Sequence, residues 1–567
     1  MPSLEIALVD WVVLVVYLAG IAAVGAYAGR HVKDTHDYFL GSRRFGKWLM
    51  IGQSFSIGTH ADMPVSLAGA VYGIGVSGIW YQWKNLFATP FYWLMAPVFR
   101  RVRRTTTAEI MEDRYGPWMG VFYTAFALAF FTINTASMLK GSAKVISQVV
   151  GGHAPVNEIV TAMTAIFILY SFIGGLVATA WTDFLQGFLI IVLSFLLIPL
   201  GWGVVGGMGG MRASLGASMF SLATPAGIGP WFILMLTLNG LIGIMAQPHV
   251  TASVGTGKDE YACRSGFMYG NMVKRICTMG WAMVGLIVAA MVAQRQFGVS
   301  ELHEPEEAFG FACRRLLFPG GVGLLLACLL AANMAACSAF MVDSGALFTR
   351  NIYQRYLAPR RSEGHYLWVG RISGLTITLA SAVYALFFIE RVLYSFLLTE
   401  TLATYVGIGV LGGVVWRRAN RWGAVASAAV AMVTNFAVYL AMGERFDHWD
   451  PNVFLAALTA GIVALVAVSL LTPPEPWPQV KGFFRRLQTP SHYGLDDDET
   501  EEKAREREKT AAQNGEQLLL VNLLNPVRGA AGVGFWKAYR IDFKGFVYGW
   551  LLALAMVAVA WLAFCAW

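Results

Sequence analysis

The stretch that decides the fold runs from residue 51 to residue 75 and reads IGQSFSIGTHADMPVSLAGAVYGIG. It is apolar enough to enter a bilayer, yet its centre carries Thr59, His60, Asp62 and Pro64. A carboxylate and a helix-breaking proline are costly in hydrocarbon, so we expect irregular backbone that faces a polar cavity rather than lipid. Half-helix ends and unwound carbonyls near the bilayer midplane can coordinate a cation and a polar solute together. The stretch therefore predicts the binding site of a transporter.

The composition of the whole chain agrees with a membrane location. Hydrophobic residues make up 57% of the 567 residues and charged residues only 13%, well outside the usual composition of soluble proteins. At about 20 apolar residues per helical span, this length allows about 13 or 14 spans. We therefore predict an all-α polytopic membrane protein with about 14 transmembrane helices.

The net charge of +8 reflects topology. Lysines and arginines fall mainly in alternate short loops, so we expect the lipid bilayer and no nucleic acid as a partner. Glu5 and Asp10 precede the first apolar run, whereas Arg30, Lys33 and Arg43 follow it, which places the N-terminus outside. An even number of spans then places the C-terminus outside as well. We expect a multi-pass protein of the plasma membrane, in bacteria the inner membrane.

The predicted spans divide the chain into five parts. Residues 1–45 hold an extra N-terminal span and its inner loop, and residues 46–415 hold the core. Residues 416–472 hold two additional spans, and residues 544–567 hold the last one. Between them, residues 473–543 include the charge run DDDETEEKAREREK, which we interpret as part of a solvated cytoplasmic linker.

Five short motifs carry a family resemblance. They are DYFLGSRR (37–44), LAGAVYGIG (67–75), WTDFLQG (181–187), AQPHV (246–250) and LFTRNIYQRYL (347–357). In order and spacing they resemble the sodium:solute symporter family, which includes sugar, proline and sialic acid cotransporters. The resemblance implies a LeuT-like core of two inverted five-helix repeats. It also implies a secondary active transporter that moves a small polar solute (a sugar, amino acid or carboxylate) with sodium by alternating access.

The resemblance further implies a sodium site between the second and ninth spans. It assigns backbone carbonyls of Ser56, Thr59 and Ala332 to this site, together with two hydroxyls. The two hydroxyl positions hold Ala335 and Ala336 in this chain. Sodium takes oxygen ligands and alanine methyls supply none, so an unmodified copy of the site is expected to bind weakly.

Three explanations for the missing hydroxyls stay open. Asp183 and Ser338 could form the family's second sodium site. The coupling ion could instead be a proton taken up by Asp62 or His60, because burial moves the pKa of such groups towards neutrality. Finally, a lysine could occupy the cation position and remove ion coupling. Lys84 is the best lysine candidate because it lies about 12 Å into the third span, with Asp62 as its natural partner.

Several polar residues are candidate solute contacts. Gln82 and Asn85 lie three residues apart and so share one helical face, although they could equally well bond to neighbouring helices. Tyr81-Gln82-Trp83 resembles the Tyr-Glu-Trp of sugar-transporting members. Gln247 falls in the family's broken sixth core helix, where its counterpart borders the cavity. The full set of candidate solute contacts is Asp62, Met63, Gln82, Lys84, Asn85 and Gln247.

Other function classes have less support. A non-transporting sensor that signals through the cytoplasmic tail is an alternative that binding without flux would favour. An enzyme is not expected, because no His, Asp and Glu set has metal-ligand spacing and no Ser/His/Asp set is evident. The six cysteines show no paired spacing. We expect no cofactor, with Na⁺ or H⁺ as the coupling ion.

Overall fold

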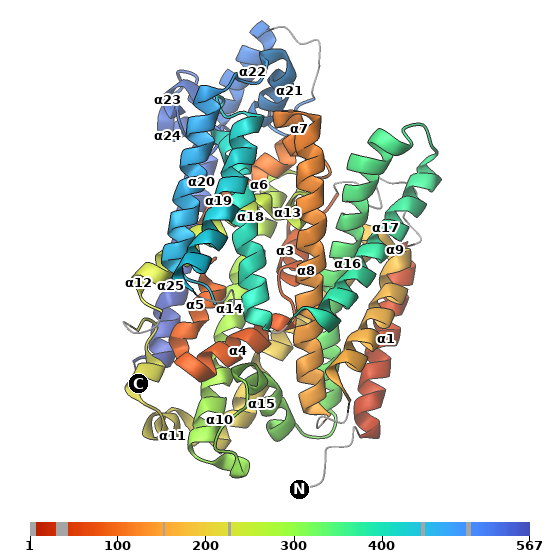
Figure 1. Cartoon of the computed structure of the whole chain (residues 1–567), viewed down its shortest axis with the longest axis vertical. Coiled ribbons are helices and arrows are strands. Elements are labelled where there is room, and N and C mark those ends of the chain that lie inside the picture. The colour runs from red at the N-terminus through yellow and green to blue at the C-terminus, as the bar shows by residue number, and fades with distance from the viewer. Residues whose placement is uncertain are drawn as a thin grey trace.

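The chain forms a bundle of helices. The structure is a computed structural model that describes residues 7–29, 44–150, 154–224, 228–389, 391–443, 448–494 and 501–566. Within these ranges the regular structure is helical, and the β-structure is limited to one isolated bridge between Phe45 and Gly257. Most long helices run along the long axis of the molecule, and α21 and α22 lie at one end of it (Figure 1).

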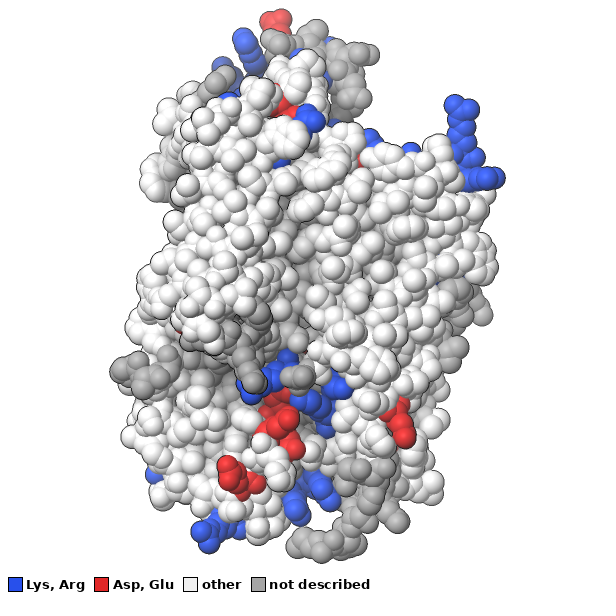
Figure 2. Space-filling view, in the orientation of Figure 1, with Lys and Arg blue, Asp and Glu red and all other residues white. Residues whose placement is uncertain are grey.

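The helices are those of a multi-pass membrane protein. In the described part of the chain, nine helices are long and apolar enough to cross a membrane, and one bent pair of helices can form a tenth span. On the face shown in Figure 2, a wide belt carries almost no charged side chains, and charges gather above and below it. The all-α polytopic prediction is confirmed. The number of about 14 spans is not confirmed, because several expected spans are broken into shorter helices.

The stretch from residue 51 to residue 75 is one of these broken spans, as predicted. Helix α3 (Lys47–Ile57) ends at Gly58, and α4 (Asp62–Ile74) begins four residues later. Pro64 lies in the first turn of α4, where a proline removes no helical hydrogen bond. The polar centre of the stretch therefore coincides with a gap between two half-helices.

The expected third span is also broken. Helix α5 (Trp80–Trp83) is followed by a turn, and α6 (Thr89–Arg101) then continues to the cluster of arginines at its end. We had expected Lys84 to lie within a continuous span, but it lies in the turn. Pro90 opens α6 in its first turn, which fits a new helix starting there.

A third break contains Gln247. Helix α12 (Pro230–Gly243) passes through a short 3-10 turn (Ile244–Ala246) into α13 (Pro248–Gly255), and the chain bends by 66° at this point. Pro248 is the first residue of α13, so its missing N–H leaves no helical bond unmade. This broken helix and the α3–α4 break are the two discontinuous helices expected of inverted repeats.

The connection that we expected between the fifth and sixth spans is helical. Residues 179–187 belong to α9 (Val156–Phe195), a helix of 40 residues. At about 1.5 Å per residue, such a helix is about 60 Å long, twice the thickness of the hydrocarbon core. The WTDFLQG motif (181–187) therefore lies within this helix and not in a loop.

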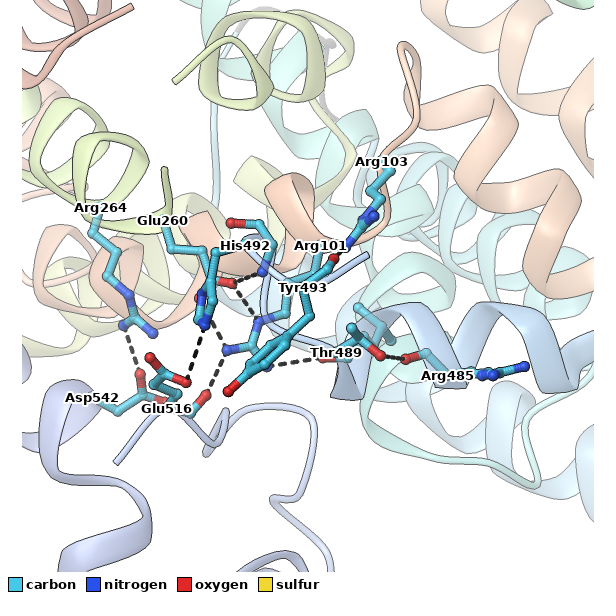
Figure 3. Close-up of polar contacts among 12 residues, drawn as sticks. Arg101, Arg103, Glu260, Arg264, Arg485, Thr489, His492, Tyr493, Glu516 and Asp542 are labelled. Carbon is cyan, nitrogen blue, oxygen red and sulfur yellow. Dashed lines mark hydrogen bonds and ion pairs between the residues drawn. The ribbon is translucent and has the colours of Figure 1, made fainter. Parts of the chain in front are cut away.

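The polar segment before the last span is packed against the bundle rather than solvated throughout. It contains α21 (Trp477–Gln488) and α22 (Glu501–Asn514), and the last helix, α25 (Arg540–Phe564), begins before the predicted boundary. The guanidinium of Arg101 holds this segment at the end of α6. It donates to both carboxylate oxygens of Glu260 at 2.9 and 3.0 Å and to the Leu487 carbonyl at 3.2 Å (Figure 3).

Further bonds fasten the same segment, which we call the tail (residues 473–543). The Ser491 amide donates to Glu260 Oε1 at 2.7 Å, and Arg103 donates to the Tyr493 carbonyl (Figure 3). Arg264 forms a buried ion pair with Asp542 at 2.6 Å. None of these contacts involves the charge run itself, and the sequence did not predict them because composition does not reveal which backbone groups distant arginines bind.

Candidate functional site

The three helix breaks border one cavity of about 50 Å³. Helices α8 (Pro117–Val149), α14 (Glu260–Ala293), α16 (Gly321–Phe348) and α18 (Val392–Val415) contribute further lining residues. Ligand pockets usually measure about 300–1,000 Å³, so the helices are contracted around the site in this conformation. The polar lining includes Ser54, His60, Asn85, Gln247, Lys274 and Glu400.

The predicted solute contacts divide into two groups. Met63, Asn85 and Gln247 line the cavity, as the sequence predicts. Asp62, Gln82 and Lys84 are buried but are not part of the lining. Asp62, Gln82 and Lys84 each lie beside a lining residue, either along the chain or in the packing. They therefore form a layer of polar groups behind the cavity wall.

Lys84 is paired with Glu400. Its side chain is fully buried, its ammonium forms an ion pair with the Glu400 carboxylate on α18, and it lies 5.0 Å from the centre of the Phe396 ring. The predicted partner, Asp62, was wrong. Lys84 lies in the turn after α5 and contacts α18, whereas Asp62 lies at the start of α4 and contacts His60. This geometry also excludes a lysine that extends to the membrane surface.

Asp62 lies against His60 and against a glycine of α8 (Pro117–Val149). Its Oδ1 is 3.3 Å from His60 Nδ1, and both side chains are buried. A Cβ atom at Gly141 would lie 2.7 Å from the Asp62 Cβ and 2.9 Å from its Cα, closer than atoms can pack. A glycine is therefore required at this position to let α8 approach the break.

Gln82 is buried outside the cavity lining, and its backbone is bound to α14. Arg275 Nη1 donates to the Gln82 carbonyl at 2.7 Å, and Trp83 Nε1 donates to the Arg275 carbonyl at 3.1 Å. The Gln82 amide nitrogen is buried and makes no hydrogen bond within the described residues. The sequence left open whether Gln82 contacts the solute or a neighbouring helix. Its backbone contacts a neighbouring helix.

The predicted sodium ligands lie on α3, at the break and on α16. Ser56 is fully buried, and its hydroxyl has no hydrogen-bond partner within the described residues. The Thr59 hydroxyl donates to the Phe55 carbonyl at 2.6 Å, and the Ser338 hydroxyl to the Ala335 carbonyl at 3.2 Å. Ala332, Ala335 and Ala336 are all buried in α16. The Ser56 hydroxyl oxygen, which has no partner, is a suitable ligand for a cation, whereas the methyl groups of Ala335 and Ala336 cannot bind one.

The side chain of Asp183 lies outside the described residues, so the second predicted sodium site stays a prediction. Within the described residues there is no group of three or more His, Cys, Asp and Glu side chains that could hold a metal ion. Neither sodium site is tested by this geometry.

Sequence reasoning missed two charged residues of the cavity, Lys274 and Glu400. Both are buried, and both line it. The signal was available, because each lies near the middle of a long apolar helix, where charged residues are rare and functional. The aromatic side chains that complete the wall, Tyr92, Phe130, Phe267, Phe340 and Phe396, carry no such signal.

Comparison with known proteins agrees with the fold. The family model described as "SSF: Sodium:solute symporter family" matches residues 38–431. The chain is 26% identical over 499 residues to a sodium/proline symporter of Haemophilus influenzae, a match that covers 81% of this chain and 93% of that one. It is 21% identical over 504 residues to a sodium/glucose cotransporter of Vibrio parahaemolyticus, with 82% and 91% covered.

A solved structure shares the fold. A Na⁺-coupled sialic acid symporter, solved in a substrate-bound outward-open state, superimposes with a TM-score of 0.72 at 18% identity, and the match covers 83% of this chain and 99% of that one. The helix breaks, the buried polar cavity and the family match over more than half of the sequence therefore agree, and the chain belongs to the sodium:solute symporter family.

Proposed function

We propose that this integral membrane protein is a secondary active transporter that carries a small polar solute together with sodium by alternating access. The observation that supports this most directly is the cavity where the α3–α4 and α12–α13 breaks meet. Unwound backbone at bilayer depth is tolerated only where protein or a polar cavity satisfies it. Family membership supports sodium as the coupling ion.

The solute binds among the groups that line the cavity, with Met63, Asn85 and Gln247 as contacts from the three breaks. Sodium binds between α3 and α16, where the carbonyls of Ser56 and Ala332 and the orphaned Ser56 hydroxyl supply oxygen. These assignments rest on the predicted positions and on the burial of the Ser56 hydroxyl without a partner.

The orientation follows the distribution of charge. The start of α1 (Leu8–Gly29) and the end of α25 lie in the lower half of Figure 1, and α21 and α22 lie at the opposite end. Arginines gather at the tail end, where α6 and the π-helical turn Thr349–Leu357 finish. We therefore place the tail in the cytoplasm and both termini outside, in a bacterial inner membrane.

The test is transport in proteoliposomes of purified protein. An inward sodium gradient should drive uptake of one solute from a panel of sugars, amino acids and carboxylates, and a potassium gradient of equal size should not. Uptake that follows a proton gradient and ignores sodium would contradict sodium coupling. Solute binding without uptake under any gradient would contradict transport itself, and chemical change of the solute would indicate an enzyme.

A further inference from the structure

Lys274 is a buried cation without a partner in the cavity. Its side chain lines the cavity wall from α14, and the residue is only 6% exposed. No hydrogen-bond acceptor or carboxylate pairs with its Nζ within the described residues. A buried ammonium without a counter-charge is costly at bilayer depth, so an anion at this point would be strongly stabilised.

The charged groups around Lys274 do not supply that anion. Arg275 and Lys84 are themselves cations, and the buried carboxylates of this region are those of Asp62 and Glu400. Asp62 lies against His60, and Glu400 is engaged by Lys84. Both carboxylates therefore already have a partner, and neither forms an ion pair with Lys274 within the described residues.

The backbone next to Lys274 also favours a negative group. Helix α13 starts at Pro248, directly after Gln247, and Gln247 and Val250 both line the cavity. The N-terminus of a helix carries partial positive charge, which favours carboxylates and phosphates. Pro248 has no N–H and the Val250 amide donates to the Gln247 carbonyl at 3.2 Å, so this end acts mainly through the helix dipole. The uncompensated lysine and this half-helix end border the same cavity.

The rest of the wall limits what the anion can be attached to. Phe130, Phe267, Phe340 and Phe396 form an apolar part of the lining. A solute with an additional ammonium group would find the carboxylate of Glu400 already paired with Lys84. A neutral sugar would leave Lys274 without a counter-charge. The wall therefore fits an anionic head on a compact, uncharged body.

We infer that the transported solute is a small monocarboxylate whose carboxylate pairs with Lys274, while its body packs against the phenylalanine rings. This inference rests on the proposed function and deepens it by naming the class of solute. With one sodium ion bound, such a solute leaves the cotransported pair electrically neutral.

The experiment is sodium-driven uptake by proteoliposomes of a series of monocarboxylates from acetate to benzoate, each beside its uncharged amide. Alanine and glucose serve as the zwitterion and the neutral sugar, and protein-free liposomes correct for leakage. We expect saturable uptake of at least one monocarboxylate and none of its amide. Lys274→Gln should raise the KM for the carboxylate roughly tenfold or more.

Two further variants make the result specific. Lys274→Arg keeps the charge and should retain uptake of the carboxylate, whereas Lys258→Gln, at an exposed lysine, should change nothing. Lys274→Gln should also gain affinity for the amide, because the positive charge that required an anion is gone. This gain separates a role in recognition from a loss of folding.

The possible failures are distinguishable. Sodium-driven uptake of alanine, glucose or an amide by the wild type, without uptake of any monocarboxylate, would overturn the inference and leave the proposed function standing. Carboxylate uptake with an unchanged KM in Lys274→Gln would overturn the role of Lys274. The absence of uptake for every solute would overturn both the inference and the proposed function.

Discussion

The ammonium of Lys84 and the carboxylate of Glu400 form an ion pair inside the membrane-spanning part of the protein, beside the solute cavity. The pair joins the turn between α5 and α6 to the middle of α18. Two charges at this depth satisfy each other, and the removal of one leaves the other buried without its partner.

Removal of one partner should therefore destabilise the protein strongly. We expect Lys84→Met to lower the free energy of unfolding by about 3–5 kcal/mol, because Glu400 is left buried and unpaired. The double variant with Glu400→Gln should recover most of this loss. Thermal melting of the purified variants measures both effects, and equal destabilisation by the single and double variants would contradict a direct pair.

The close approach of α8 to Asp62 gives a steric prediction. Gly141→Ala should cost about 1–3 kcal/mol of stability and slow uptake, because its Cβ would overlap the backbone of Asp62. Gly73→Ala on α4 is the matched control, since no heavy atom lies within 4 Å of a Cβ built there. Similar melting temperatures for the two variants would show that α8 can move away freely.

Restored hydroxyls should strengthen sodium binding. Ala335→Ser and Ala336→Ser return the side chains that the family resemblance implies, at positions that are fully buried in α16. Each new oxygen ligand should contribute on the order of 1 kcal/mol, about a fivefold fall in the sodium concentration for half-maximal uptake. Ala346→Ser, further along the same helix, should have no such effect. An unchanged sodium dependence in both restored variants would place the ion elsewhere.

The tail should detach when Arg101 is lost. Arg101→Ala removes the bonds to Glu260 and to the Leu487 carbonyl, and it leaves the Glu260 carboxylate largely buried. We expect faster tryptic cleavage within the tail and a lower melting temperature. Lys258→Ala is the control at a more exposed cation of the same region. Cleavage at the wild-type rate would show that the other contacts of the tail hold it in place without Arg101.

The tail also predicts a dependence on pH. Partial burial raises the pKa of the Glu516 carboxyl above its ordinary value of 4.5. In the folded state this group binds its proton more tightly than in the unfolded chain, so its contribution to stability is present at low pH and is lost as the pH rises through the raised pKa. Glu516→Gln should therefore gain in melting temperature relative to wild type as the pH increases from 4.5. A constant difference across this range would contradict the prediction.

The helix break between residues 57 and 62 could be predicted because local chemistry marks it. Asp62 and Pro64 within an apolar stretch are compatible with few structures, and the break between α3 and α4 is one of them. The break after α5 has a weaker signal, since only Pro90 marks the new helix. A broken helix and a continuous helix can have nearly the same composition, so composition alone does not reveal the break after α5.

Pairings between distant segments could not be predicted. Asp62 and Glu400 are both buried carboxylates, and only the position of the turn after α5 beside α18 decides that Lys84 binds the second. The same is true of the tail, where buried Arg101 binds carbonyl oxygens that every sequence possesses. Lys274 differs, because a lysine near the middle of an apolar helix is visible in the sequence.

The attachment of α21 has a mechanical consequence. Its Leu487 carbonyl accepts from Arg101 at the end of α6, while its Arg486 binds Asp113 on α7 (Thr107–Tyr115). Any conformational change that separates the end of α6 from α7 must therefore stretch or break these bonds. The activation barrier of such a conformational change includes the breaking of these bonds. Residues that never approach the solute can therefore slow or accelerate the transport cycle.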